Sequence, residues 1–512
     1  AQFNFSLEEE SFELKEMIIE APPIKKRGDT LSYHVDSFAR DYDRTISDVI
    51  KRMPGIDVKE NGQILYQGTP INKYYIEGLD MLQGRYNLAN ENLPFKEVLD
   101  VQVIENHQPI RLLDSLTFSE NAAINIKLKN KQVLTGQAKV GTGISPLLWD
   151  ANVTPMYFAK NNQALFTYQS SNAAYDVSNQ LTTLSQSEIN YENQSVGSSN
   201  LLSLTSPTTP GIPQKYWLDN NAHLLNFNAI KKLNNNYELK LFSSYINDYQ
   251  KQYGEKYTQI FTNTDTLSLL QNIDNKISSN AFIFGSEILR NSTSDYLLNR
   301  LEFKLNSNNE TGKINANNEF IENYLSKKYW SLTNRFSKYI FLGKQLSEFN
   351  SLISYGVNNL KLQVSPGQFS EILNEGNPYS HVTQNVDSKD FNTSNSIGFT
   401  KGLGSFTLSP KIGFDFEQKI FNSNLVIDGN EKLNADYKNE IDWKYNRIFA
   451  NLGIQFRYKN WRAGIDLPLN YRLYDVRKNN SNEKNISFNK LNLEPSLYLV
   501  KDVNKFWQVS AS

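Results

Sequence analysis

The chain has 512 residues, and its 53 Lys and Arg nearly balance 54 Asp and Glu, so the net charge of −1 gives no electrostatic reason to expect a nucleic-acid partner. It contains no cysteine, which excludes disulfides, thiolate metal sites and cysteine nucleophiles. Mean hydropathy is −0.53 and no apolar run reaches about 18 residues, which excludes transmembrane helices but not a membrane barrel, because only alternate residues of its strands face lipid.

Residues 1–30 are predicted to be an N-terminal extension or linker. Phe3, Phe5 and Leu7 alternate with polar residues, as the last strands of an upstream sandwich domain would. Pro22-Pro23 and the basic residues that follow indicate a linker. The start of the chain has neither a basic segment nor an apolar core, so we expect a mature or trimmed chain.

Residues 31–132 are predicted to form a compact mixed α/β domain. Asp43 is the predicted N-cap of a short helix, and Pro54-Gly55 is predicted to end this helix. Asn61-Gly62 joins two short strands, which is a strong hairpin signal. One apolar stripe with helical spacing follows the predicted cap: Ile46, Val49, Ile50 and Met53.

Residues 133–512 alternate between apolar and polar side chains over long segments. The clearest hairpin spans residues 452–473, where Lys459-Asn460 is a two-residue turn. After this turn one face is apolar from Trp461 to Leu473, whereas Arg462 and Asp466 lie on the opposite face. We expect the apolar row to face lipid and the polar row to face a lumen. The 28 Tyr and 29 Phe suit aromatic girdles at the two membrane interfaces.

Two polar segments interrupt this alternation. Residues 173–215 and 364–392 are rich in small and polar residues, so we expect solvated loops outside the cell or disordered insertions. About a dozen to fourteen spanning strands can be placed after Thr135. The chain stops at Ser512 within an apparent strand and is therefore expected to be a fragment of a larger barrel.

An ordered series of short motifs lies between residues 53 and 128. Pro54-Gly55-Ile56 is followed by strands that end in Gln67-Gly68 and Glu77-Gly78, and then by Ala123 to Ile126. This order resembles the plug domain of TonB-dependent outer-membrane receptors of the Bacteroidota type. Gln67 and Glu77 depart from that pattern, which has Arg and Asp there, and Asn106 to Pro109 replaces Arg-Gly-Pro. The resemblance therefore supports the fold more strongly than energised transport.

The resemblance implies an antiparallel, up-and-down membrane β-barrel with a small mixed α/β plug at its N-terminus. Barrels of that family have about 22 strands, and a carboxypeptidase-regulatory-like domain, largely missing here, often precedes the plug. The implied location is the outer membrane of a Gram-negative cell. The implied plug motif consists of Pro54, Gly55, Gly68, Glu77 and Gly78.

The resemblance also implies coupling to the periplasmic TonB complex, because the sequence contains no nucleotide-binding motif. Such coupling uses a short peptide that pairs as an added strand. An alternative is that this peptide is the first plug strand or the exit strand of the lost domain. The candidate segment consists of Glu16, Met17, Ile18, Ile19, Glu20 and Ala21.

Catalytic function has little support in the sequence. The four histidines occur in no recognisable hydrolase or zinc motif, and the acidic residues Asp57, Asp80 and Asp100 lack ligand spacing, so we predict no enzyme, cofactor or metal site. His107 is expected to be a structural histidine. The leading hypothesis is import of a large nutrient, an oligosaccharide or a peptide, with a surface lipoprotein of the starch-utilisation type as a possible partner. The alternatives are a non-transporting scaffold in an outer-membrane secretion, assembly or motility complex, and a soluble β-rich binding protein.

Overall fold

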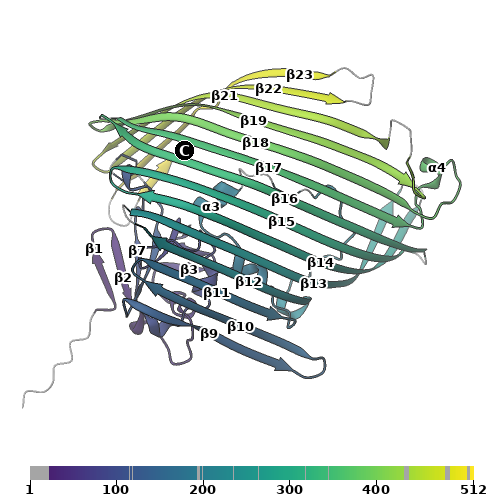
Figure 1. The fold of residues 1–512 in the computed structure, drawn as a ribbon, viewed down its shortest axis with the longest axis horizontal. Helices are drawn as coiled ribbons and strands as arrows, with labels where there is room; N and C mark the ends of the chain where they lie inside the picture. The colour runs from purple at the N-terminus through teal and green to yellow at the C-terminus, as the bar shows by residue number, and fades with distance from the viewer. Residues whose placement is uncertain are drawn as a thin grey trace, which may run out of the picture.

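The computed structural model places an N-terminal domain inside one end of a large antiparallel barrel (Figure 1). None of the helices in the described residues is long and apolar enough to cross a membrane. The described residues are 22–114, 116–117, 119–192, 197–198, 200–233, 236–262, 265–316, 319–343, 345–431, 437–478, 485–503 and 508–511.

The N-terminal domain, which we call the plug, has two sheets. The larger sheet has the order β1-β2-β7-β8-β6 and is antiparallel except for the parallel pair of β6 and β8, and β3-β4-β5 form the second. The elements of the plug are β1 (Ile24–Arg27), β2 (Thr30–His34), η1 (Val35–Ser37), α1 (Ile46–Ile50), β3 (Ile56–Val58), β4 (Ile64–Tyr66), β5 (Thr69–Pro70), β6 (Lys73–Ile76), α2 (Asn87–Asn90), η2 (Phe95–Glu97), β7 (Val98–Ile104), η3 (Arg111–Leu113) and β8 (Ala123–Leu128).

The apolar stripe of α1 is buried in the plug core as predicted, with Ile46, Val49 and Ile50 fully buried and Met53 nearly so. The predicted cap was wrong. Thr45 is the N-cap of α1, and the carboxylate of Asp48 accepts the Thr45 backbone N–H at 3.1 Å. Asp43 is diverted by other partners, because its carboxylate accepts the Arg40 N–H and pairs with Arg52.

The barrel strands follow one another around the sheet in chain order, and the sheet closes between β25 and β9. They are β9 (Gln132–Gly143), β10 (Leu148–Ala159), β11 (Asn162–Ser171), β12 (Asp219–Lys232), β13 (Tyr237–Phe261), β14 (Thr266–Asn291), β15 (Asp295–Ala316), β16 (Glu319–Leu342), β17 (Gln345–Ser365), β18 (Val382–Leu403), β19 (Phe406–Ile427), β20 (Asn430–Glu431), β21 (Asn439–Tyr458), β22 (Trp461–Lys478), β23 (Ile486–Leu493), β24 (Ser496–Asp502) and β25 (Gln508–Ala511).

The barrel wall has an apolar outer face and a polar inner face. On β13, Leu241 and Tyr245 are exposed outside, whereas Lys240 and Ser244 are buried inside. On β22, Trp461, Ile465 and Leu469 are exposed outside, and Arg462 points inward to pair with Glu120 of the plug at 3.4 Å. The predicted register is therefore confirmed, and this inside-out distribution of polarity is typical of a membrane-spanning barrel.

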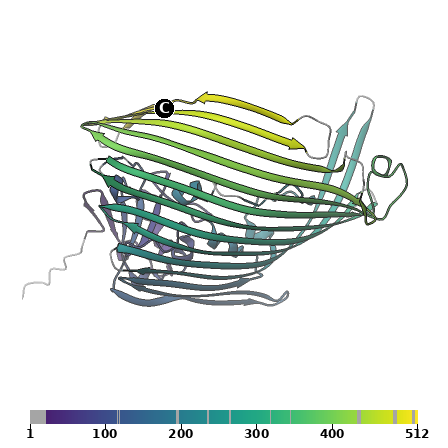
Figure 2. The same ribbon diagram turned by 45° about the horizontal axis from the view of Figure 1, so that its top comes forward.

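Several strands are much longer than a membrane crossing requires. β13 has 25 residues and β14 has 26, whereas about 9–11 tilted residues span a bilayer. The barrel therefore extends well past the plug, which occupies only one end (Figure 2). The turn at Lys459-Asn460 is confirmed by the direct pairing of Tyr458 with Trp461.

The plug is held by wall strands on different sides of the lumen. Gln163 of β11 donates from Nε2 to the Ile76 carbonyl at 2.8 Å. Asn291, at the end of β14, donates to the Pro109 carbonyl at 2.7 Å. On β19, the Thr407 hydroxyl donates to the Leu116 carbonyl at 3.2 Å. The predicted seating of the plug inside the barrel is thus confirmed.

The expectation for residues 173–215 was wrong in its described parts. The connection from β11 to β12, which we call the lumenal loop, folds back into the barrel instead of extending outward (Figure 1). It contains η4 (Val177–Leu181), α3 (Gln186–Glu192) and η5 (Gln214–Tyr216). Its polar composition is compatible both with a polar lumen and with bulk water, so the composition does not distinguish between the two.

The second predicted loop, residues 364–392, is shorter than expected. Only 366–381 connect β17 to β18, and this connection carries the short helix α4 (Ser370–Leu373) at the far end of the barrel (Figure 1). Residues 382–392 belong to β18 and pair with both of its neighbours. The polar residues here line a strand because a barrel wall accepts polar side chains on its inner face.

Candidate functional site at the plug and barrel interface

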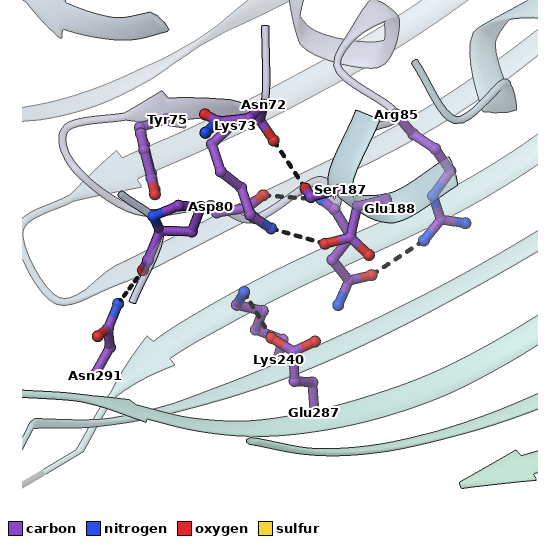
Figure 3. Close-up of polar contacts among 12 residues, drawn as sticks. Asn72, Lys73, Tyr75, Asp80, Arg85, Ser187, Glu188, Lys240, Glu287 and Asn291 are labelled. Carbon is purple, nitrogen blue, oxygen red and sulfur yellow. Dashed lines mark hydrogen bonds and ion pairs between the residues drawn. The ribbon is translucent and has the colours of Figure 1, made fainter. Parts of the chain in front are cut away.

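The site begins at Lys73, the first residue of β6. Its ammonium lies 2.8 Å from the Asp80 carboxylate and 2.7 Å from the Glu188 carboxylate. Asp80 comes close because Glu77-Gly78 reverses the chain, with Ile76 and Leu79 exchanging two backbone hydrogen bonds of 3.0 Å across the turn. Figure 3 shows Lys73 extending from the plug toward Glu188.

Glu188 belongs to α3 of the lumenal loop. Its two carboxylate oxygens have different partners, since Oε1 contacts Lys73 and Oε2 lies 2.7 Å from Nη1 of Arg300 on β15. The neighbouring Ser187 hydroxyl donates to the Asn72 carbonyl of the plug at 2.9 Å. One carboxylate therefore joins a plug cation to a wall cation.

The wall contributes a row of three charged residues on adjacent strands. Glu287 of β14 lies directly opposite both Lys240 of β13 and Arg300 of β15 in the sheet register. Its carboxylate is 2.8 Å from the Lys240 ammonium and 2.5 Å from the Arg300 guanidinium. All three side chains are buried, and Lys240 and Glu287 are drawn together on the wall in Figure 3.

The six side chains of this ionic network balance in charge. Three cations, Lys73, Lys240 and Arg300, meet three carboxylates, Asp80, Glu188 and Glu287. Removing ions from water is costly, and a buried network tolerates this only when each member is paired. The loss of any single member would therefore leave an uncompensated buried charge.

The network holds its plug and loop members in their charged forms. Burial alone would lower the pKa of Lys73, but Asp80 and Glu188 together raise it well above its usual value. Burial would likewise raise the pKa of Glu188, but Arg300 and Lys73 hold it well below the ordinary carboxyl range. Both groups are charged at neutral pH.

A polar cavity of about 250 Å³ adjoins the network between plug and wall. Lys73, His107 and Arg111 line it from the plug, and Lys240 and Glu287 line it from the wall. A space of this size and polarity accommodates water. The plug is therefore not packed tightly against the wall on this side.

His107 lines the plug side of the cavity and is held by two hydrogen bonds, as expected of a structural histidine. Its Nδ1 lies 3.0 Å from the Asn72 amide oxygen, and its Nε2 lies 3.3 Å from the Tyr75 hydroxyl. Burial, followed by the charge of Lys73, lowers the pKa of His107 to about 4. The ring is therefore neutral, with Nδ1–H donating to Asn72 and Nε2 accepting from Tyr75.

The residues of the predicted plug motif form turns and do not join the network. Gln67-Gly68 and Glu77-Gly78 each have two consecutive positive φ angles, as tight hairpin turns require. Gly55 also has a positive φ, and the Pro54 carbonyl accepts the Tyr33 hydroxyl at 2.8 Å. Only the Glu77-Gly78 turn bears directly on the site, because it places Asp80 beside Lys73. The coupling candidate, residues 16–21, lies outside the described residues.

The ionic network was not predicted from the sequence. Lys240 and Arg300 fall on the polar face of predicted strands, which marks them as lumenal but not as partners. Asp80 is not spaced from other acidic residues as a metal ligand would be, because its partner is the Lys73 ammonium and not a metal ion. Glu188 lies 112 residues before Arg300 in a segment without periodicity. Charged residues on a predicted lumenal face are the one signal that marked this region.

No family model matches the chain. No curated protein matches it either. Among solved structures, it is similar to the ferric-catecholate import receptor Fiu of E. coli K12, with 8% identity over 93% of this chain and 83% of that chain, and a TM-score of 0.30. The ferric yersiniabactin uptake receptor FyuA of Yersinia pestis has 10% identity over 94% of this chain and 91% of that chain, with a TM-score of 0.30. The siderophore receptor PiuA of Acinetobacter baumannii has 10% identity over 94% of this chain and 85% of that chain, with a TM-score of 0.32. Identities and TM-scores this low carry no functional argument.

Proposed function

We propose that this chain is a TonB-dependent receptor of the outer membrane that imports cargo through a plugged barrel. One observation carries the proposal: one end of the lumen is occupied by a plug that is joined to the wall by a buried network of non-covalent ion pairs. A barrel of this width would leak without a plug, and a transporter needs a plug that can yield. The proposal gives the chain no catalytic role and no resident cofactor or metal.

The barrel lies in the outer membrane of a Gram-negative cell, with its apolar outer face in lipid. We place the plug at the periplasmic end, because the coupling candidate that precedes it has to reach the periplasmic TonB complex. The long extensions of β13 and β14 beyond the plug then point away from the cell. The Bacteroidota origin, and the surface lipoprotein that would bind these extensions, rest on the resemblance of the plug motifs.

We infer that the cargo is a large neutral nutrient, an oligosaccharide or a peptide. The buried inner face is rich in hydroxyl and amide groups, which bind such molecules through hydrogen bonds. Its ionised groups are largely paired with one another and show no bias of sign. The hydroxyl and amide groups include Thr154, Thr167, Gln169, Asn226, Asn228, Ser244, Ser331, Thr333, Ser354, Asn358 and Ser388.

The test uses Ile18, at the centre of the coupling candidate. Ile18→Pro removes a backbone donor needed for strand addition, whereas Ile18→Ala retains it. Growth on a panel of oligosaccharides and peptides should be lost in the proline variant and in a strain without TonB, and kept in the alanine variant. Immunoblots of outer-membrane fractions check that all variants are inserted. Uptake that survives both the proline change and the loss of TonB would overturn the proposal.

One observation favours the alternative of a non-transporting scaffold. The lumenal loop already covers the inner side of the plug, so the barrel is closed by two layers. A scaffold would keep both layers permanently. If outer-membrane complexes purified with this chain keep their composition without TonB, and no substrate supports growth, the scaffold function takes the place of transport.

A further inference from the structure

The lumenal loop is far longer than its connection requires. β11 and β12 are adjacent antiparallel strands, and turns of about 2–5 residues commonly join such pairs. Here the connection runs from residue 172 to residue 218. Connections this long inside compact domains usually have a function of their own.

The first half of the loop covers the plug. The Leu184 N–H donates to the Gly84 carbonyl at 2.9 Å, and Gln63 donates back to the Leu184 carbonyl at 3.3 Å. Asn92 of the plug donates to the side chain of Gln180 at 3.2 Å. These contacts are hydrogen bonds that hydroxyl and amide groups of another molecule, or water, can replace.

The second half of the loop rests on the wall farther from the plug. Leu202 and Leu204 pack with residues of β16, β17 and β18. The Thr205 carbonyl accepts the Asn275 side-chain N–H of β14 at 2.9 Å. Pro207 lies against Gly254 of β13, where an added Cβ would come within 2.7 Å of the proline Cβ. Cargo entering from outside therefore meets this half of the loop before it can reach the plug.

Glu188 gives the loop a specific role in the ionic network. Its carboxylate links Lys73 of the plug to Arg300 of the wall. Without it, Lys73 still has Asp80, whereas Glu287 is left to pair with both Arg300 and Lys240, so the wall keeps one uncompensated positive charge. The plug would then carry a neutral pair that no longer bridges to the wall.

We propose that the lumenal loop is a cargo-operated lid, and that Glu188 is the group through which the lid latches the plug to the wall. The inference rests on the transport function proposed above. Cargo rich in hydroxyl or amide groups competes for the loop's hydrogen bonds and lifts it. The departing carboxylate breaks the bridge between Lys73 and Arg300, so this link from plug to wall opens only after cargo has arrived.

The first test measures hydrogen exchange of the purified full chain in detergent. Glu188→Gln should raise exchange of plug amides in residues 73–80 about ten-fold or more, because the bridge loses its charge. Glu310→Gln is the matched control, since Glu310 is a buried lumenal carboxylate paired with Lys327 within the wall itself. Equal exchange in the two variants would overturn the latch. Heat-dependent migration of the barrel on gels confirms that both variants fold.

The second test locks the lid. Because the chain has no cysteine, Pro207→Cys with Gly254→Cys creates a single possible disulfide between loop and wall. The loop must shift by about 1 Å to allow normal disulfide geometry. Oxidation should abolish growth on the imported nutrient, and reduction should restore it. TonB-dependent growth that is unaffected by oxidation would overturn the lid and leave the transport function standing. If growth does not depend on TonB but Glu188→Gln still raises exchange in residues 73–80, the transport function would be overturned and the latch would stand.

Discussion

The plug is attached to the barrel in two different ways. Toward β9 to β12, the wall residues Val133, Met156, Phe158, Leu165 and Ile230 are buried in the same apolar cluster as the plug core. Toward β13 to β15, the plug meets the wall through the ionic network with a polar cavity beside it, and through a smaller apolar contact of Leu112 with Tyr296 and Leu298. The first attachment is a continuation of a hydrophobic core, whereas the second is built mainly from paired charges.

The difference matters because the two kinds of contact respond to different changes. Apolar burial is non-directional and grows with area, so no single chemical event removes it. A buried ion pair depends on each partner, and the removal of one partner converts stabilisation into a penalty. We therefore expect the plug to remain anchored at β9 to β12 while it is released at β13 to β15.

The largest effect should come from breaking the ionic attachment. Arg300→Leu leaves Glu188 and Glu287 without their shared cation and should reduce the free energy of plug opening by about 5 kcal/mol. Hydrogen exchange of residues 73–80 measures this quantity. Lys327→Leu, which breaks a pair within the wall, should leave plug exchange unchanged. Similar values in the two variants would mean that the network does not hold the plug.

A somewhat smaller effect is expected at the apolar attachment. Phe158 is almost fully buried. Phe158→Ala should lower the free energy of unfolding by about 3–5 kcal/mol, because apolar burial is lost and a cavity is left. Phe166 is the matched control because it lies on the exposed outer face of the next strand. If Phe158→Ala raised exchange only in residues 73–80, the two attachments would not be independent.

Acid should weaken the plug through His107. The folded pKa is about 4, below the ordinary value of about 6.5, so the unfolded plug binds the proton more tightly. The stability this histidine contributes is fully present above pH 6.5 and is lost as the pH falls toward 4, by about 2–4 kcal/mol. Denaturation of the plug followed at several pH values should show this slope. His107→Gln should flatten it.

The plug and the alternating wall could be predicted from sequence because both depend on local patterns. The α1 stripe repeats with helical spacing, and the β22 residues alternate strictly between lipid and lumen. Such features need no knowledge of distant residues.

The site could not be predicted because it is assembled from distant segments. Lys73 and Glu188 are 115 residues apart, and Glu188 and Arg300 are 112 residues apart. The lumenal loop has no periodicity, and a polar segment is equally compatible with solvent and with a polar lumen. The cap was missed for a smaller reason, because Asp43 and Thr45 are both good N-cap residues and tertiary contacts decide between them.

The smallest effect tests whether the plug's own stability is separate from both attachments. Asp48 in α1 accepts the backbone N–H groups of Arg44 and Thr45, each at 3.1 Å, and these bonds lower its carboxyl pKa although burial alone would raise it. Asp48→Ala should therefore lower the free energy of unfolding of the plug by about 1 kcal/mol. Because the folded pKa is depressed, the contribution is present above about pH 3.9 and is lost only as the pH falls through the folded value. The exposed Asp57→Ala should be nearly neutral. Exchange should rise in α1 of the Asp48 variant while residues 73–80 keep the wild-type rate, since helix capping and the charged bridge to the wall are independent.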